Sequence, residues 1–146
     1  MIAQSATLRL STKGHDDCVD ITARVNDAVR DSRLGEGLAT ISAIGSTASI
    51  TTIEFEPGVV DDLRQAVRRL FPENARYAHH ETAGDDNGFA HVRASFIGPS
   101  ITIPVSAGKL QLGTWQQIIL LDFDARPRER TVIVQLLGTA EHSSNK

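Results

Sequence analysis

The amino-acid sequence predicts an α+β fold, a single domain with a largely antiparallel β-sheet, two main helices and a short third one. Most apolar segments are short, rich in Ile, Val and Thr, and separated by tight turns, which is typical of strands joined as hairpins. Both long helical patterns lie in the first half of the chain. This order is not the regular strand–helix alternation of a doubly wound sheet, so we expect helices and hairpins to segregate.

In the first half of the chain, the spacing of apolar residues predicts five elements. They are a strand over 3–11, a helix over 20–31, strands over 38–44 and 48–55, and a helix over 57–70. The first strand alternates apolar and polar residues, whereas the helices repeat apolar residues every three or four positions. Asp20 suits an N-cap, Pro57 suits a first helical turn, and Pro72 ends the second helix. Gly35-Glu36-Gly37 is predicted to be a turn.

The second half predicts mainly strands. They cover residues 101–105, 109–112, 115–123 and 131–137. The unbroken apolar run from Ile118 to Leu121 predicts a strand that is covered on both faces. Residues 126–130 are expected to form a solvated polar connection. The whole chain, 1–146, is expected to be one domain, in which residues 139–146 fray.

The length, composition and charge of the chain limit the classes of function that it could have. At 146 residues, 40% hydrophobic and 23% charged, the chain suits one globular domain, and a formal charge of −3 gives no reason to expect nucleic-acid binding. No apolar run approaches the ~20 residues that cross a bilayer, and the N-terminal residues do not resemble a secretory signal. Cys18 is the one cysteine, and we expect it to be a packing residue. A cytoplasmic location, without a membrane partner, is expected.

Residues 77–100 concentrate side chains that bind metals and catalyse reactions. They include His79, His80, Glu81, Asp85, Asp86 and His91. We expect a loop that leads into a short helix at about Phe89. Two neutral imidazoles with a carboxylate would form a site for a divalent metal, whether Zn, Mn or Mg, and the two aspartates would suit Mg²⁺ beside a phosphate. Solvated side chains, or a plain turn over Asp85-Asp86-Asn87-Gly88, are the alternatives.

Other candidate residues lie outside this segment or later in it. Glu54 interrupts an apolar strand, so it faces either the site, as base or ligand, or solvent. Ser46 and Thr47 form either a plain turn or an anion site in which Asn87 could also take part. Arg93 is a candidate phosphate clamp. For the arginines of 126–130, a solvated turn is the favoured interpretation.

Four stretches of the sequence resemble one known family over residues 40–138. They are STASITTIEFEPGVVDDL, HHETAGDDNGFAHVRASFIGPS, GKLQLGTWQQI and DFDARPRERTVIVQLLG. The chain is similar in these stretches to the YjbQ-like family, which carries the label secondary thiamine-phosphate synthase. The resemblance implies an α+β fold that assembles as a homotrimer. It also implies that His79, His91, Glu54, Trp115 and Gln116 fall on recurring site positions.

Many members of that family have a histidine where this chain has Gly45, and His80 is a candidate replacement. The resemblance and the ligand-rich segment together predict a small metal-dependent enzyme that acts on a phosphorylated or diphosphorylated small molecule. Thiamine-phosphate synthases proper resemble (β/α)₈ barrels, which need ~250 residues, so this chain is too short to be one of them. Any such activity would come from an unrelated site, as a weak side reaction. The alternatives are a phosphate-ester hydrolase, a non-catalytic trimeric protein that binds a metal or anion, and a purely structural loop.

Two further expectations concern the site and the assembly. The third metal ligand is expected to be Glu54 or His80. Asp85 or Asp86 is expected to orient a histidine ligand by accepting a hydrogen bond from its ring N–H. Part of the late apolar surface is expected to lie at a trimer interface near the site. Its residues are Leu110, Leu112, Trp115 and Ile118.

Overall fold

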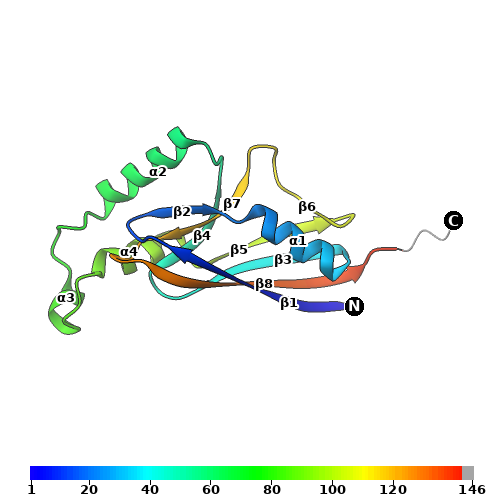
Figure 1. Cartoon of the computed structure of the whole chain (residues 1–146), viewed down its shortest axis with the longest axis horizontal. Helices are drawn as coiled ribbons and strands as arrows, with labels where there is room; N and C mark the ends of the chain where they lie inside the picture. The colour runs from blue at the N-terminus through cyan, green and yellow to red at the C-terminus, as the bar shows by residue number, and fades with distance from the viewer. Residues whose placement is uncertain (143–146) are drawn as a thin grey trace.

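The structure of the protein, a computed structural model, describes residues 1–142, which form eight strands and four helices (Figure 1). The elements are β1 Ile2–Thr12, β2 Asp17–Asp20, α1 Thr22–Ser32, β3 Leu34–Ile44, β4 Ala48–Ile53, α2 Pro57–Leu70, α3 Ala78–Thr82, α4 Gly88–Ile97, β5 Ser100–Ser106, β6 Lys109–Leu110, β7 Gln117–Asp122 and β8 Arg128–Ala140. The α+β fold is confirmed. Helices α2, α3 and α4 gather at one end of the molecule, and the N-terminus lies toward the other. No helix in the described residues has the length and apolar character needed to cross a membrane.

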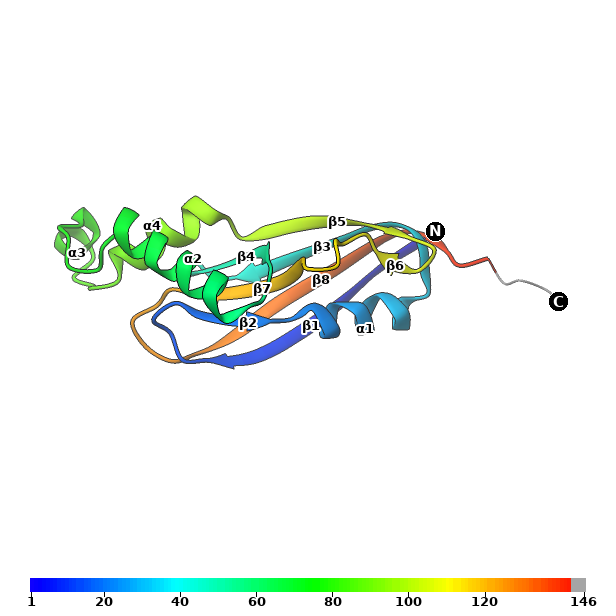
Figure 2. The ribbon, with the colours of Figure 1, turned by 90° about the horizontal axis from the view of Figure 1, so that it is seen from above.

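The strands form two antiparallel sheets. A five-stranded sheet has the order β1-β8-β3-β5-β6, and a three-stranded sheet has the order β2-β7-β4. Figure 2 shows α1 and α2 on the same side of the molecule as the three-stranded sheet. The predicted antiparallel pairing is therefore confirmed, but the strands divide between two sheets.

The three-stranded sheet is buried on both faces. Ile118 and Leu120 of β7 pack against α1 and the five-stranded sheet. Ile119 and Leu121 pack on the other face, together with Phe89 of α4 and residues of α2. Because successive side chains of a strand point to opposite faces, both cores draw on one continuous apolar run. The predicted double cover of this strand is confirmed, and Ile118 is too deeply buried to lie on a subunit interface.

The predicted turn at residues 35–37 is wrong, because these residues belong to β3. The register of β3 against β8 shifts between Leu34 and Glu36, and Gly37 pairs with Gly138. A Cβ atom on Gly37 would lie 2.1 Å from the carbonyl oxygen of Leu137. The glycine therefore permits a close approach of two strands rather than a reversal of the chain.

Other boundaries also differ from the predictions. Strand β2 was not expected, and Trp115 lies outside β7. Strand β8 runs from Arg128 through Ala140, which pairs with Leu34. Residues 139–140 are therefore paired and not frayed, whereas residues 143–146 of the predicted tail lie outside the described part of the chain.

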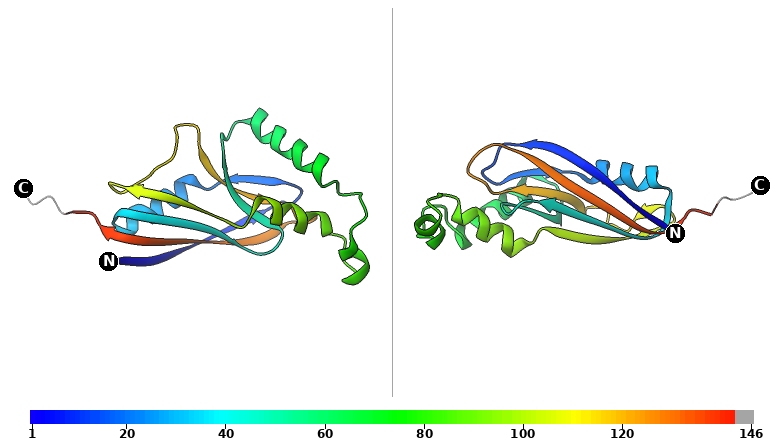
Figure 3. Two further views of the ribbon diagram at one scale, coloured as in Figure 1. Left: turned by 180° about the vertical axis from the view of Figure 1, so that it is seen from behind. Right: turned by 90° about the horizontal axis from the view of Figure 1, so that it is seen from below.

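The outer face of the five-stranded sheet carries no helix of the described residues (Figure 3). Its cross-strand rows consist of small, hydroxyl-bearing and aliphatic side chains and one amide, Gln135. These rows are Ala3–Leu137–Leu38–Pro104, Ser5–Gln135–Thr40–Thr102 and Thr7–Ile133–Ser42–Ser100. Charged side chains are few on this face, with Arg9 and Glu129 toward one end. Antiparallel sheets commonly leave one face to solvent, and the exposed large apolar side chains in these rows are those of Leu38 and Leu137.

Cys18 is expected to be unreactive in the folded protein. Its side chain packs between β7 and α2, and burial raises the pKa of the thiol to about 11. At pH 8 we expect labelling by a disulfide reagent to be ~100-fold slower than in the urea-unfolded chain, because the thiolate is the nucleophile. The raised pKa stabilises the fold below pH ~8.5, and this contribution is lost as the pH rises toward 11. Equal labelling rates in the two states would contradict the buried environment.

Candidate functional site

The central segment folds back and brings two of its histidines together. His79 lies on α3 and His91 on α4, and their ring centroids are 4.7 Å apart, with the rings nearly perpendicular. Rings this close can both reach one ion with metal–nitrogen bonds of ~2.0–2.1 Å. The expected juxtaposition is present, and the role of the pair as metal ligands stays a prediction.

The two imidazoles differ in their hydrogen bonds. The Nδ1 atom of His91 lies 3.2 Å from the carbonyl oxygen of Ser46. Because a carbonyl only accepts, Nδ1 carries the proton in this contact and Nε2 keeps its lone pair. The Nε2 atom of His79 is buried and has no hydrogen-bond partner within residues 1–142. Buried polar atoms are rarely left without a partner, so this nitrogen is a natural contact for a ligand.

The contacts of His80 differ from those of His79. Its Nε2 atom accepts the backbone N–H of Gly88 at 3.1 Å, and its ring packs against Tyr77 with a centroid distance of 5.5 Å. A Cβ atom on Gly88 would lie 2.7 Å from Cβ of Tyr77, so the close approach requires glycine. The Nε2 atom of His80 thus holds the start of α4, and this geometry does not support His80 as a metal ligand.

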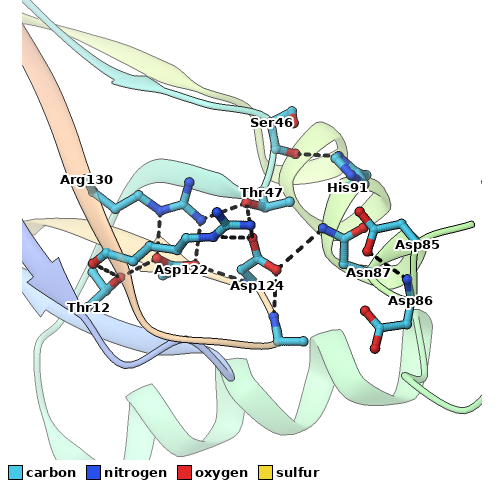
Figure 4. A network of polar contacts seen from close by, with 12 residues as sticks. Thr12, Ser46, Thr47, Asp85, Asp86, Asn87, His91, Asp122, Asp124 and Arg130 are labelled. Carbon is cyan, nitrogen blue, oxygen red and sulfur yellow. Dashed lines mark hydrogen bonds and ion pairs between the residues drawn. The ribbon is translucent and has the colours of Figure 1, made fainter. Parts of the chain in front are cut away.

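A buried polar network connects the site to both sheets (Figure 4). Nδ2 of Asn87 donates to Asp124 at 3.4 Å, and the Thr47 hydroxyl donates to the same carboxylate at 3.1 Å. Arg130 donates two hydrogen bonds of 2.7 Å to Asp122 and one of 2.7 Å to Thr47. The Oδ1 atom of Asn87 is buried and has no partner in the described residues. The hydroxyl of Thr47 is therefore engaged in the network. This geometry does not support the predicted role of Thr47 in binding an anion.

The two aspartates of the network are ionised. Burial opposes the ionisation of Asp122, but hydrogen bonds from Arg130, Thr12 and the backbone N–H of Asp124 outweigh it and lower its pKa. Burial of Asp124 is likewise outweighed, by hydrogen bonds from the next backbone N–H and from Arg128, so its pKa is also lowered. Each carboxylate therefore balances an arginine charge at the edge of the site.

Arg93 does not face the histidines. Its side chain is 2% exposed, and its guanidinium donates to Asp16 at 2.7 Å and twice to the carbonyl oxygen of Phe71. Arg68 of α2 donates to the other oxygen of Asp16 at 2.8 Å. These contacts fasten α2 and α4 to the turn between β1 and β2. They do not support the predicted catalytic role of Arg93, because its donors are occupied in a structural ion pair.

Asp85 and Asp86 are exposed in the loop before α4. The carboxylate of Asp85 accepts the backbone N–H of Asp86 at 2.8 Å. Both residues line a cavity of about 220 Å³ with Asn87, Arg126 and Arg128. His79 and His91 are not among the residues that line this cavity.

A second cavity, of about 210 Å³, opens beside His91. Its lining includes Gly45, Ser46, Ala48, Ala94, Ser95 and Pro99. Arg130 lies behind Gly45, since a Cβ atom built there would be 3.0 Å from Nη1 of the arginine. A side chain at this position would press on the guanidinium of Arg130, and the positive φ of Gly45, 137°, favours glycine there.

The remaining predicted residues lie at the other end of the three-stranded sheet. Thr47 precedes β4 and Glu54 follows it, so at ~3.3 Å per residue the strand separates them by ~20 Å. Trp115 is 71% exposed, and Nε2 of Gln116 donates to Thr52 at 3.2 Å. Within residues 1–142, no group of three or more His, Cys, Asp or Glu side chains is arranged to hold a metal. One chain thus supplies two imidazoles, and the expected third ligand, Glu54, is remote.

The sequence interpretation missed the buried network of Thr12, Asp122 and Arg130. A signal was available, because Arg130 is in phase with Val132 and Val134 on the buried face of β8. Period-two alternation therefore placed this arginine inside, where it needs an ionised partner.

The fold and the site define a small α+β domain with a histidine pair at the helical end of its two sheets. Residues 6–139 match the model of the family described as UPF0047 protein YjbQ-like, and the chain belongs to this family. A UPF0047 protein of Archaeoglobus fulgidus is 38% identical over 130 residues, which cover 89% of this chain and 98% of that protein.

Solved structures agree with this assignment. A YbjQ-like protein of unknown function from Sulfolobus solfataricus aligns with a TM-score of 0.90 and 33% identity, over 94% of this chain and 98% of that one. A hypothetical protein from Aeropyrum pernix aligns with a TM-score of 0.87 and 30% identity, over 93% and 99% of the two chains. The resemblance to the YjbQ-like family is confirmed.

Proposed function

We propose that His79 and His91 bind a divalent metal, and that the protein acts there on a phosphorylated or diphosphorylated small molecule. The observation that carries this proposal is the buried Nε2 atom of His79, which has no partner in the described residues and belongs to a ring 4.7 Å from that of His91. The carbonyl of Ser46 fixes the His91 tautomer that leaves Nε2 free to coordinate. Imidazole ligands favour Zn over Mg or Mn.

The cavity beside His91 supports the phosphate part of the proposal. Ser46 and Ser95 line it, and Nη1 of Arg130 lies behind its wall at Gly45. Hydroxyl and guanidinium donors bind phosphate oxygens, and a bound metal would supply charge stabilisation for a leaving phosphate. Weak thiamine-phosphate synthase activity and phosphate-ester hydrolysis are both compatible with these groups.

Assembly as a homotrimer is part of the same proposal. It is supported by the outer face of the five-stranded sheet, whose rows of uncharged side chains lack a cover in residues 1–142. Leu38 and Leu137 on this face are 46% and 50% exposed. A second copy seated on this face would remove the apolar surface of Leu38 and Leu137 from water. Light scattering should give the mass of a trimer at micromolar concentration, and a monomer would contradict this part.

Turnover by metal-loaded protein tests the catalytic part. The substrates are a hydroxymethylpyrimidine diphosphate with a thiazole phosphate and, separately, a simple phosphate monoester. We expect His79→Ala to lower turnover at least ~100-fold, because loss of a metal ligand removes the charge stabilisation of the transition state. Glu81→Ala, an exposed neighbour on α3, is the matched control and should keep wild-type turnover. Unchanged turnover in His79→Ala would contradict the site, and metal binding without turnover would favour the non-catalytic alternative.

A further inference from the structure

The guanidinium of Arg130 keeps one nitrogen unused. Its Nε and Nη2 atoms donate to Asp122 and Thr47 at 2.7 Å, whereas Nη1 makes no hydrogen bond within residues 1–142 (Figure 4). The side chain is only 8% exposed. Nη1 is not one of the fully buried atoms that lack a partner, so it keeps some contact with solvent. This nitrogen can therefore offer its N–H donors to a ligand.

The turn after β3 lies against this nitrogen. A Cβ atom on Gly45 would be 3.0 Å from Nη1, so a side chain at this position would cover the nitrogen, and glycine leaves it accessible. Gly45 and Ser46 are exposed, and their backbone N–H groups have no hydrogen-bond partner in the part of the chain that the structure describes. The carbonyl oxygen of Ser46, in contrast, is engaged by His91. Successive backbone N–H groups in a turn are a recurrent binding site for anions.

The cavity beside His91 has a lining that suits an anion. Gly45 and Ser46 line it together with Ser95, and none of its lining residues in the described chain is acidic. The carboxylates of the neighbouring buried network are each paired with an arginine. The cavity volume of about 210 Å³ is below the roughly 300–1,000 Å³ of pockets that enclose drug-sized ligands. It therefore suits one end group of a ligand rather than a whole substrate.

We infer that Gly45, Ser46 and Arg130 form a phosphate subsite that does not require a metal. Nη1 of Arg130 and the two backbone N–H groups bind oxygens of a terminal phosphate, and the adjoining atoms of the substrate lie beside His91, which lines the same cavity. A tetrahedral phosphate presents more oxygens to these donors than a planar carboxylate does. The inference rests on the phosphorylated substrate of the proposed function, and it makes position 45 a determinant of which anion is bound.

Titration of metal-free protein with inorganic phosphate tests the subsite apart from the histidine pair. In ¹H–¹⁵N spectra recorded with EDTA at pH 7.5, we expect saturable shifts of the Gly45 and Ser46 amide signals. Acetate at equal ionic strength should bind at least ~10-fold more weakly, because it makes fewer charge-assisted hydrogen bonds. Saturation at these amides without any zinc binding would support the subsite and contradict the metal part of the proposed function. No saturable shift at the turn, or equal affinity for acetate, would overturn the subsite and leave the histidine proposal in place.

A glycine substitution tests the part that position 45 plays. Gly45→Ala should weaken phosphate binding at least ~10-fold, because its methyl group would press on Nη1 of Arg130. Gly84→Ala is the matched control, since Gly84 also has a positive φ, 65°, but a Cβ atom there would meet no other atom within 4 Å. Wild-type affinity for phosphate in folded Gly45→Ala would overturn the role of this glycine. The wild-type titration needs no variant, so it decides the subsite even where Gly45→Ala does not fold.

Discussion

Replacement of Arg130 by alanine is expected to lower the free energy of unfolding by ~3–5 kcal/mol, because it leaves a buried carboxylate without its cation. The side chains of Arg130 and Asp122 are 8% and 0% exposed, and three hydrogen bonds of 2.7 Å join Arg130 to Asp122 and Thr47. This contact links β8 of the five-stranded sheet to β7 of the other sheet. Urea unfolding followed by circular dichroism measures the loss. Arg126→Ala, in the exposed turn, is the control and should cost less than ~0.5 kcal/mol.

The same network predicts the response to acid. The pKa values of Asp122 and Asp124 are lowered in the folded state, so their contribution to stability is present above the pKa of the unfolded carboxyl group, about 3.9. It is lost as the pH falls through the lower folded values. We expect Asp122→Asn to flatten this acid limb of the stability curve. A cost below ~1 kcal/mol for Arg130→Ala would contradict the buried ion pair.

The second large effect concerns metal affinity. His79→Ala and His91→Ala should each weaken Zn²⁺ binding more than ~100-fold, since removal of a ligand costs more than removal of its supporting hydrogen bond. The fold should stay intact, because α3 buries none of its residues and His91 is only partly buried. His142→Ala, an exposed histidine remote in sequence, is the matched control. Equal affinity of all three variants would show that zinc binds elsewhere.

Acidification should release the metal from wild-type protein. Both imidazoles must be neutral to coordinate, so protons compete with the ion and binding releases them. Calorimetry in buffers of different ionisation enthalpy measures this proton release. The expected result is tighter binding at pH 7.5 than at pH 5.5, and affinity that does not change with pH would argue against histidine ligands.

Much of the fold could be predicted from local patterns. Alternation identified β1, helical spacing with Pro57 identified α2, and the unbroken run in β7 predicted a doubly covered strand. The errors arose where tertiary contacts override local preference. Gly37 resembles a turn residue, but its lack of a side chain serves a close approach to Gly138. Sequence alone does not reveal which neighbour a glycine accommodates.

The site was only partly predictable for the same reason. The density of ligand-type residues drew attention to His79 and His91, whose rings lie 4.7 Å apart in the structure. It could not distinguish them from Arg93, which is of a suitable residue type but is occupied by Asp16, seventy-seven positions away in the chain. The position of Glu54, ~20 Å from Thr47 along an extended strand, likewise depends on the strand between them.

The most direct test of the account is a crystal structure of the protein grown with Zn²⁺ or Mn²⁺, with the ion located by anomalous scattering. The account predicts a peak ~2.0–2.2 Å from the Nε2 atoms of both His79 and His91. Saturating metal with no peak between the two imidazoles, and an Nε2 atom of His79 that bonds only to protein groups, would contradict it.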